Sequence, residues 1–355
     1  MHILHVVGAR PNFMKAAPVY AALSEIAGCR QTLVHTGQHY DPNMSDVFFQ
    51  QLGMPAPDLN LAVGSGSHAQ QTAEIMQRFE PVVLDAMPDM VVVYGDVNST
   101  LAATVVCSKL TVPVAHVEAG LRSGDRTMPE EINRLVTDQL SELLFTPSED
   151  ADQNLAREGI GVRKIHLVGN VMIDTLVRLL PLTEKVNVPS SPYVLVTLHR
   201  PSNVDDLSWL RELLAVLSEV ASRMKVIFPV HPRTRARIGE MQVVPSSTNL
   251  ELLDPLPYLE FLALQKSAAA VITDSGGIQE ETTYLGVPCL TVRENTERPV
   301  TITMGTNVLV GRDLQRLSRE LANSLAAGTG KRQPVPLWDG SAAQRIAAII
   351  ARQFS

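Results

Sequence analysis

The chain has 355 residues, 45% of them hydrophobic and 19% charged, so it is long enough for two globular domains that each bury a core. Its net charge of −7, without a long Lys/Arg run, argues against a nucleic-acid binder. Three scattered cysteines predict a reducing cytoplasm, and the lack of a basic leader or a bilayer-length apolar run predicts neither export nor a membrane span.

Short apolar runs alternate with longer amphipathic segments, which predicts βα units that build parallel sheets. The first expected strands cover residues 3–7, 32–35, 90–94, 113–117, 143–146 and 165–168. The second set covers residues 193–198, 225–230, 250–252, 270–273, 289–292 and 307–310. A segment with three prolines, residues 181–192, separates the sets. We therefore predict α/β domains at 1–180 and 181–340, followed by an amphipathic terminal helix at 341–355.

Polar residues follow the strands of the first domain directly. Arg10 follows the first strand, Asp96 follows the third, and Glu118 and Arg122 follow the fourth. Open α/β sheets bind ligands beyond the carboxyl ends of their strands, so we expect these side chains to converge. For Asp96, which precedes an Asn-Ser-Thr run, a helix cap is an equally good interpretation.

The segment from residue 128 to 134 predicts a helix start, with Pro129 in its first turn and Glu130 and Glu131 near the positive end. Glu130 and Arg134 stand at i and i+4, so an ordinary ion pair is the alternative explanation. If the helix start returns to the strand ends, Asp96, Glu118 and Glu130 share one pocket. Mutual repulsion and burial then raise at least one carboxyl pKa, as proton transfer near neutral pH requires.

The second domain offers a phosphate site at the junction after the apolar run 268–273. Ser275, Gly276 and Gly277 lead into a helix, where missing Cβ atoms and unpaired N–H groups favour a diphosphate. Glu281 lies one turn further on, where a carboxylate can accept ribose hydroxyls. A capped helix after a Gly-Gly turn explains the same residues.

Other polar side chains add to the predicted site. His199 and His231 follow strands of the second domain, and His231 equally suits a structural role. Local cations for one small anion are Arg10, Lys15, Arg122, Arg134 and Arg298. We dismiss a metal site at His35, His39 and Asp41, because no second ligand cluster supports it.

In chain order, these motifs resemble the non-hydrolysing UDP-N-acetylglucosamine 2-epimerases over nearly the whole length. The resemblance rests on the segments 8–11, 94–96, 116–122, 129–134, 197–200, 274–281 and 296–299. It implies the GT-B fold, two Rossmann-like domains with parallel sheets that face each other across a cleft, with the terminal helix crossing back to the first domain. The chain has no Gly-x-Gly-x-x-Gly fingerprint or Walker loop, so neither NAD nor ATP is expected.

The resemblance implies reversible conversion of UDP-GlcNAc to UDP-ManNAc through elimination of UDP and re-addition to a 2-acetamidoglucal. Asp96, Glu118 and Glu130 would form the acid/base set, and His199 would contact the diphosphate. The other implied or proposed substrate contacts are Arg10, Lys15, Arg122, Glu131, Arg134, His231, Phe261, Ser275, Gly276, Gly277, Glu281 and Arg298. Phe261 would flank uracil, although such an aromatic is as often part of a core. No cofactor or metal is implied, and the expected assembly is a homodimer.

Two features leave the substrate and its regulation open. Regulated relatives carry a glutamine-bearing helix after residue 39, whereas this chain has Tyr-Asp-Pro-Asn-Met-Ser-Asp at 40–46, which argues against activation by substrate. The same segment resembles relatives that act on UDP-2,3-diacetamido-glucuronate, while the Thr-Glu-Arg-Pro at 296–299 favours UDP-GlcNAc. A hydrolysing epimerase, a GT-B glycosyltransferase and a non-enzymatic sugar-nucleotide sensor are the remaining alternatives.

Overall fold

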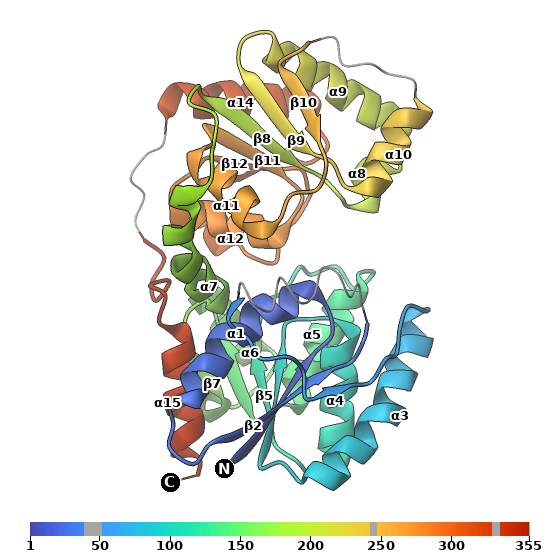
Figure 1. The fold of residues 1–355 in the computed structure, drawn as a ribbon, viewed down its shortest axis with the longest axis vertical. Coiled ribbons are helices and arrows are strands. Elements are labelled where there is room, and N and C mark those ends of the chain that lie inside the picture. The colour runs from blue at the N-terminus through green and yellow to red at the C-terminus, as the bar shows by residue number, and fades with distance from the viewer. Residues whose placement is uncertain (39–51, 242–246, 329–333, 355) are drawn as a thin grey trace. The chain divides into compact units, whose positions relative to one another are not determined.

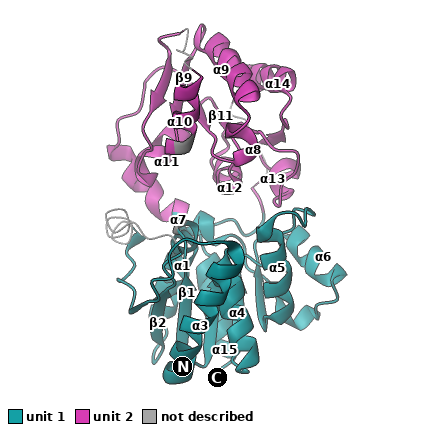
Figure 2. Ribbon diagram, turned by 90° about the vertical axis from the view of Figure 1, so that its right-hand side faces the viewer, with its two compact units in different colours: residues 1–175, 336–355 teal, residues 176–335 magenta. Residues whose placement is uncertain are grey.

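The computed structural model describes residues 1–38, 52–241, 247–328 and 334–354, and the chain divides into two compact units. Unit 1 comprises residues 1–175 and 336–355, and unit 2 comprises residues 176–335 (Figure 2). The sequence analysis predicted domain boundaries after residues 180 and 340. These boundaries refer to domains that fold independently, and they stay predictions. Among the described residues, no helix combines the length and apolar character that a bilayer span requires.

Unit 1 is built on a seven-stranded sheet in the order β3-β2-β1-β4-β5-β6-β7, with every pair parallel. Its strands are β1 (His2–Val7), β2 (Arg30–His35), β3 (Leu59–Asn60), β4 (Met90–Tyr94), β5 (Val114–Val117), β6 (Leu143–Thr146) and β7 (Ile165–Leu167). The sequence analysis missed β3, because two residues are too few to show an apolar period. The strand order reverses at β1 and β4, where open sheets of this class bind ligands.

The helices α1 and α3 to α6 of unit 1 lie between strands of its sheet in the chain, whereas α7 follows the last of these strands and α15 is the last element of the chain (Figure 1). The helices of this unit are α1 (Arg10–Ser24), α3 (His68–Ala86), α4 (Asn98–Lys109), α5 (Pro129–Leu140), α6 (Glu149–Arg157), the 3₁₀ turn η1 (Val162–Lys164), α7 (Val171–Leu179) and α15 (Ala342–Arg352), with α7 running on into unit 2. Ile75, Phe79 and Val83 recur every four residues on α3 and join a buried cluster with Val91 and Val93 of β4. Burying each such side chain contributes about 1.5–3 kcal/mol, so this stripe fixes α3 on the sheet.

The C-terminal helix α15 packs against α1 within unit 1. Asp174 of α7 accepts hydrogen bonds from the backbone N–H groups of Ala342 (3.1 Å) and Ala343 (2.7 Å), the first residues of α15. These N–H groups have no partner inside the helix, and a carboxylate at the positive end of the dipole is favourable. Asp174 therefore fixes the start of α15.

Unit 2 contains a six-stranded sheet in the order β10-β9-β8-β11-β12-β13, again with every pair parallel. The strands are β8 (Tyr193–Thr197), β9 (Lys225–Pro229), β10 (Leu250–Leu253), β11 (Ala270–Thr273), β12 (Cys289–Thr291) and β13 (Asn307–Leu309). The helices are η2 (Leu180–Lys185), α8 (Pro201–Val204), α9 (Leu207–Ala221), α10 (Pro232–Glu240), α11 (Tyr258–Ser267), α12 (Gly276–Leu285), α13 (Val300–Thr303) and α14 (Leu314–Ala327). All six strands match the predicted runs.

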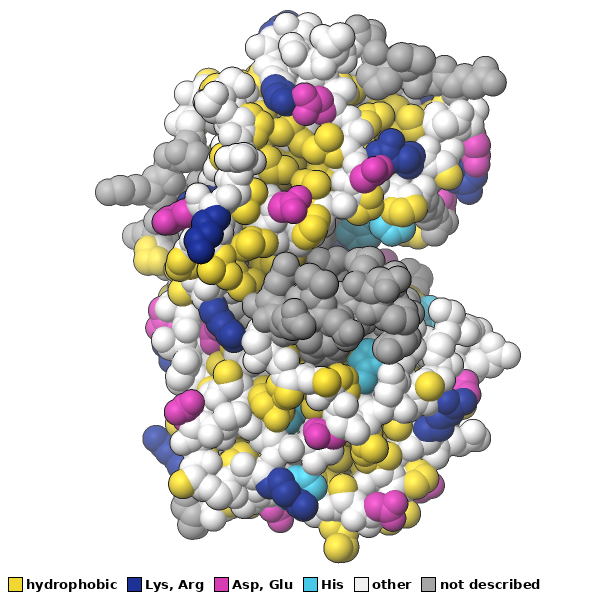
Figure 3. Space-filling model, viewed as in Figure 1, with side chains coloured by type: hydrophobic (Ala, Val, Ile, Leu, Met, Phe, Trp, Pro, Cys, Tyr) yellow, Lys and Arg dark blue, Asp and Glu magenta, His cyan; other side chains and the backbone are white. Residues whose placement is uncertain are grey.

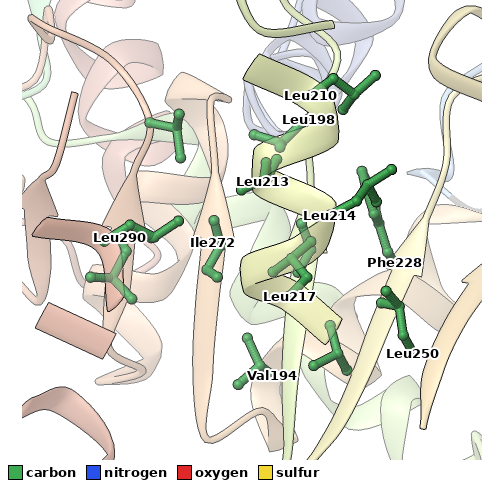
Figure 4. Close-up of a cluster of buried hydrophobic side chains, with 14 of the residues drawn as sticks. Val194, Leu198, Leu210, Leu213, Leu214, Leu217, Phe228, Leu250, Ile272 and Leu290 are labelled. Atoms are coloured by element: carbon green, nitrogen blue, oxygen red, sulfur yellow. The ribbon is translucent and has the colours of Figure 1, made fainter. Parts of the chain in front are cut away.

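One of the buried hydrophobic clusters of unit 2 lies between this sheet and α9. Leu210, Leu213, Leu214 and Leu217 of α9 belong to a buried cluster that also contains strand residues such as Phe228, Ile272 and Leu290 (Figure 4). Their spacing of three and four residues is the apolar stripe of a helix on a sheet.

Charged side chains are scattered over the face of the molecule drawn in Figure 3, where Lys and Arg stand singly or beside acidic groups. No continuous basic area is seen on the described part of that face. The view agrees with the net charge of −7.

Candidate functional site

The turn after β1 is tied to the end of β4 by one side chain. Asn12, in the first turn of α1, accepts hydrogen bonds from the N–H groups of Gly8 (3.1 Å) and Ala9 (3.0 Å) through its Oδ1. Its Nδ2 donates to the carbonyl of Tyr94 (2.8 Å). These bonds hold together the carboxyl ends of two neighbouring strands, the place where the sequence predicted a site.

Glu118, directly after β5, pairs with Lys15 of α1. Its Oε1 lies 2.7 Å from the Lys15 Nζ, and both side chains are buried. The backbone of Glu118 has φ 73°, a left-handed conformation that is costly for a residue with a side chain. A Cβ on Gly95 would lie 2.6 Å from the Lys15 Nζ and 3.7 Å from Glu118 Oε1, so the bare backbone of Gly95 borders this pair.

Asp96 is oriented by α5 through Arg134. Arg134 Nη1 donates to Asp96 Oδ2 (2.5 Å), while Nε (3.1 Å) and Nη2 (2.7 Å) donate to Glu131 Oε2. The Asp96 side chain keeps a quarter of its surface exposed. Arg134, predicted to contact substrate, thus joins Asp96 to the helix that carries Glu130 in its first turn, where Glu130 is half-buried.

The buried Glu131 holds Arg134 and the loop before α5 in place. It accepts hydrogen bonds from the N–H groups of Ser123 (3.0 Å) and Gly124 (2.9 Å), in the loop before α5. Burial acts to raise the pKa of Glu131, but these donors and Arg134 outweigh it, so the pKa lies below its ordinary value. Glu131 therefore stays ionised and holds both the loop and the Arg134 guanidinium.

A buried network that the sequence analysis missed underlies the same strand ends. His116 Nδ1 lies 2.6 Å from Asp138 Oδ1, and Nε2 lies 2.8 Å from the carbonyl of Gly95. Asp138 also accepts from the N–H of Gly120 (3.1 Å) and pairs with Arg122 (2.7 Å). Burial acts to raise the pKa of Asp138, but His116 and Arg122 lower it below its ordinary value. The only signal in the sequence was polar residues within otherwise buried positions of β5 and α5.

Arg122 forms ion pairs with two carboxylates of unit 1. Its Nε and Nη2 donate to the two oxygens of Glu158 (2.8 and 2.7 Å), in addition to the pair with Asp138. These bonds place Arg122 where it braces the loop after Glu118. A substrate contact by Arg122 remains a prediction.

In unit 2, the fully buried Asp274 joins the ends of β11 and β8. It accepts from the backbone N–H groups of His199 (3.1 Å) and Arg200 (2.9 Å) and from Asn203 Nδ2 (3.0 Å). His199 Nδ1 lies 3.0 Å from its Oδ1, and 49% of the His199 side chain is exposed. Burial acts to raise the pKa of Asp274, yet His199 and the other donors bring it below its ordinary value. Asp274 therefore orients His199 with part of the ring toward solvent.

The start of α12 combines a helix N-terminus with a fixed cation. Ser275 is its N-cap, and Gly276 and Gly277 form its first turn. A Cβ on Gly276 would lie 2.5 Å from Arg298 Nη1, so the guanidinium lies against the glycine backbone. First-turn N–H groups, the positive end of the dipole and an arginine are the elements of an anion site. We call residues 274–277, where the sequence analysis predicts a phosphate site, the phosphate turn.

Carboxylates hold Arg298 at the phosphate turn. Its Nε lies 2.9 Å from Glu280 Oε1, and Glu297 lies 3.7 Å from its Nη1. Glu297 also pairs with Arg293 (2.8 Å). Burial acts to raise the pKa of Glu297, but Arg298 and Arg293 lower it to about 2, so the pair stays charged. The sequence analysis identified Arg298 and missed its supports Arg293, Glu280 and Glu297.

The remaining predicted residues of unit 2 differ in how deeply they are buried. Glu281 is buried in α12, and the Tyr258 hydroxyl donates to its Oε1 (2.7 Å). Phe261 is partly buried against the hydrophobic cluster that contains Leu264 and Val271, which suits the core role considered for it. His231 follows β9 and is exposed.

Several predicted features fall outside the described parts of the chain. They are the side chain of Arg10, His39, Asp41 and the segment 40–46. Among the residues that the structure describes, no three His, Cys, Asp or Glu side chains gather as a metal site.

Comparison with known proteins gives the family. The family model described as UDP-N-acetylglucosamine 2-epimerase matches residues 21–351. The chain belongs to the UDP-N-acetylglucosamine 2-epimerase family. A UDP-N-acetylglucosamine 2-epimerase of Methanocaldococcus jannaschii is 41% identical over 364 residues, covering 99% of each chain. A UDP-2,3-diacetamido-2,3-dideoxy-D-glucuronate 2-epimerase of Pseudomonas aeruginosa is also 41% identical, covering 99% of this chain and 100% of the relative.

Solved structures of the epimerase family confirm the predicted fold class. The crystal structure of the M. jannaschii UDP-GlcNAc 2-epimerase in complex with UDP-GlcNAc and UDP superposes with a TM-score of 0.90 at 40% identity, covering 99% of this chain and 100% of that one. With two parallel sheets of seven and six strands, the chain has the GT-B fold. Epimerase family membership makes it an epimerase by class.

Proposed function

We propose that this chain interconverts UDP-GlcNAc and UDP-ManNAc without net hydrolysis. The observation that carries the proposal is the pairing of Glu118, in strained backbone conformation, with Lys15 beside Asp96, in a chain that also has a phosphate turn. In support, the M. jannaschii relative, 40% identical, binds UDP-GlcNAc and UDP in its crystal structure.

The reaction divides into elimination and re-addition. A carboxylate of the set Asp96, Glu118 and Glu130 takes the C2 proton, the C2–H electrons form a C1–C2 double bond, and the C1–O bond breaks to release UDP. A carboxylic acid of the set then protonates C2 on the opposite face, while a UDP oxygen attacks C1. Atoms balance without water, an oxidant or a reductant. Such general acid/base groups contribute about 10²–10⁴ each in rate.

The two units have complementary roles in this proposal. Residues 1–180 supply the acid/base groups, and residues 181–340 bind the nucleotide through Ser275, Gly276, Gly277 and Arg298. His199, oriented by Asp274, contacts the diphosphate, and Glu281 accepts the ribose hydroxyls. Since C2 is poorly acidic, proton removal must be coupled to departure of the diphosphate, whose negative charge the phosphate turn stabilises.

We further propose that the substrate is contacted by Arg10, Lys15, Arg122, Glu131, Arg134, His231 and Phe261. We propose a homodimer in the cytoplasm, and reaction only when both units engage one substrate, which keeps the glucal from escaping.

Incubation with UDP-GlcNAc in deuterium oxide tests the reaction. We expect UDP-ManNAc that carries deuterium at C2, detected by proton NMR, with no acceptor present. Free ManNAc and UDP would indicate the hydrolysing reaction instead. No exchange and no product from any sugar nucleotide would remove the proposal, and a need for an acceptor would favour a glycosyltransferase.

A second substrate is supported by the P. aeruginosa relative. Its name gives UDP-2,3-diacetamido-2,3-dideoxy-D-glucuronate as its substrate, at the same 41% identity as the M. jannaschii epimerase. Parallel assays with both sugar nucleotides decide between them. Activity on the diacetamido-glucuronate alone would show that this sugar nucleotide is the substrate, and the proposed elimination mechanism would still apply.

A further inference from the structure

Glu281 has one carboxylate oxygen satisfied and one without a donor. It is 2% exposed, and its Oε1 accepts a hydrogen bond from the hydroxyl of Tyr258, the first residue of α11 (2.7 Å). Its buried Oε2 has no hydrogen-bond partner among the described residues, and the buried amide of Gln265, also without a partner, is close enough to lower the pKa of this carboxyl. An oxygen without a donor costs free energy, so a donor from a bound molecule would stabilise it.

The sequence position of Glu281 relates this oxygen to the phosphate turn. Glu281 lies four residues after Gly277 on α12, one helical turn away on the same face. In a nucleoside diphosphate, the diphosphate and the ribose hydroxyls are separated by a distance of the same order as one helical turn. Tyr258 comes from a different helix and therefore fixes the carboxyl from the side.

Few other ionisable groups surround Glu281. On α12 itself stand Glu280, which pairs with Arg298, and the exposed Tyr284. The helix α11, which packs on α12, carries Tyr258, the exposed Glu260 and the exposed Lys266. Of the other packed elements, β12 carries Cys289, whereas β11, β13 and α13 carry no ionisable side chain. Tyr258 is thus the ionisable residue whose hydrogen bond controls this carboxyl.

We propose that Tyr258 is a positioning residue for nucleotide binding, whose hydroxyl holds Glu281 so that Oε2 faces the ribose hydroxyls. The inference rests on the proposed nucleotide site and adds a residue to it. A phenol that donates to a carboxylate forms a charge-assisted hydrogen bond, which fixes the orientation of the acceptor and favours its ionised form.

The pH dependence of binding follows from the same contacts. Burial raises the pKa of Glu281 to about 7, against the opposing effects of Tyr258 and Gln265, and Glu280 raises it further. Removing the Tyr258 hydroxyl leaves a higher pKa, so a larger fraction of Glu281 is protonated at neutral pH. A carboxylate with both oxygens able to accept then exists only at higher pH.

Isothermal titration of UDP between pH 6.5 and 9 tests Tyr258→Phe. Tyr284→Phe is the matched control, because it removes the same hydroxyl from an exposed position on α12. We expect Tyr258→Phe to weaken UDP binding about tenfold at pH 7, the loss of roughly one charge-assisted hydrogen bond. We expect part of the affinity to return at pH 9, with Tyr284→Phe following the wild type throughout.

A UDP analogue without ribose hydroxyls separates positioning from general structure. With 2′,3′-dideoxyuridine diphosphate, the penalty of Tyr258→Phe should shrink, since Glu281 has no hydroxyl to accept. An unchanged UDP affinity and pH profile in Tyr258→Phe, or an equal loss for both ligands at every pH, would overturn the inference. Binding of UDP without turnover of any sugar nucleotide would remove the proposed reaction and leave the role of Tyr258 standing.

Discussion

Units 1 and 2 present opposite charge arrangements at the ends of similar parallel sheets. In unit 1, two acids that follow strands pair with cations, Glu118 with Lys15 and Asp96 with Arg134. In unit 2, an arginine lies at a helix N-terminus and is held by the carboxylates Glu280 and Glu297. In the proposed function, the first arrangement keeps carboxylates in place for proton transfer and the second binds an anion. One type of scaffold would then support two chemistries, because the side chains after the strands differ.

Replacement of the buried acid of unit 1 should have the largest effect. We expect Glu118→Gln to lower turnover of UDP-GlcNAc about 10²–10⁴-fold, since the amide cannot exchange the C2 proton. UDP affinity should stay close to that of the wild type, because the phosphate turn lies in unit 2. Titration calorimetry with UDP and NMR assays of turnover measure both quantities.

Glu142→Gln, which changes an exposed carboxylate of the same unit, is the control and should leave both quantities unchanged. Near-normal turnover in Glu118→Gln would show that unit 1 does not carry the proton chemistry. The contrast between the units would then fail.

Replacement of the cation of unit 2 should affect binding instead. Arg298 lies against Gly276 and pairs with Glu280 at the same time, which a lysine cannot do with a single ammonium group. We expect Arg298→Lys to raise the dissociation constant of UDP by about 10- to 100-fold, as for a charged hydrogen bond worth roughly 1.5–3 kcal/mol. Arg316→Lys on exposed α14 is the matched control, and equal UDP affinity in both variants would contradict the assignment.

The smallest effect concerns stability, through Glu281. Its pKa of about 7 in the folded chain lies above the ordinary 4.5, so its contribution to stability is present below pH 4.5 and is lost as the pH rises through 7. We expect Glu281→Gln to increase the free energy of unfolding at pH 8 by roughly 1–3 kcal/mol, so that the variant unfolds at a higher denaturant concentration. The difference should be smaller at pH 5. The same variant should bind UDP more weakly.

Glu212→Gln, on the exposed face of α9, provides the control. If Glu281→Gln is destabilised at pH 8, the carboxylate is stabilised by contacts other than those described. A gain of stability with a loss of binding would show that this group is retained for the ligand and not for the fold.

The elements of the fold followed from local pattern. Val, Ile and Leu runs between amphipathic segments predicted twelve strands, and each is present because buried parallel strands need a continuous apolar sequence. The strand β3 was missed, since Leu59–Asn60 has too few residues for a period. Within unit 1, Asp96 and Glu118 do lie on neighbouring strand ends, at β4 and β5, as the βα pattern predicted.

The partners of the candidate residues followed from tertiary contacts that no spacing encodes. Glu130 and Arg134 suggested an i,i+4 pair, but Arg134 binds Asp96, 38 residues away in the sequence, and Glu131. Lys15 meets Glu118 from 103 residues away, and the His116–Asp138 pair joins a strand to a helix. Such pairings depend on which helix face packs on the sheet.

The sequence by itself determined the two parallel-sheet units and the residues that follow their strands, because apolar periodicity and glycine turns act over a few residues. Only the tertiary structure decided which charges neutralise one another and which buried carboxylate oxygens, Glu281 Oε2 among them, have no hydrogen-bond partner in the described parts of the chain. The reason is physical: burial penalises a charge without a partner, so Glu118 and Asp96 pair with cations that the packed chain supplies, however distant in the sequence.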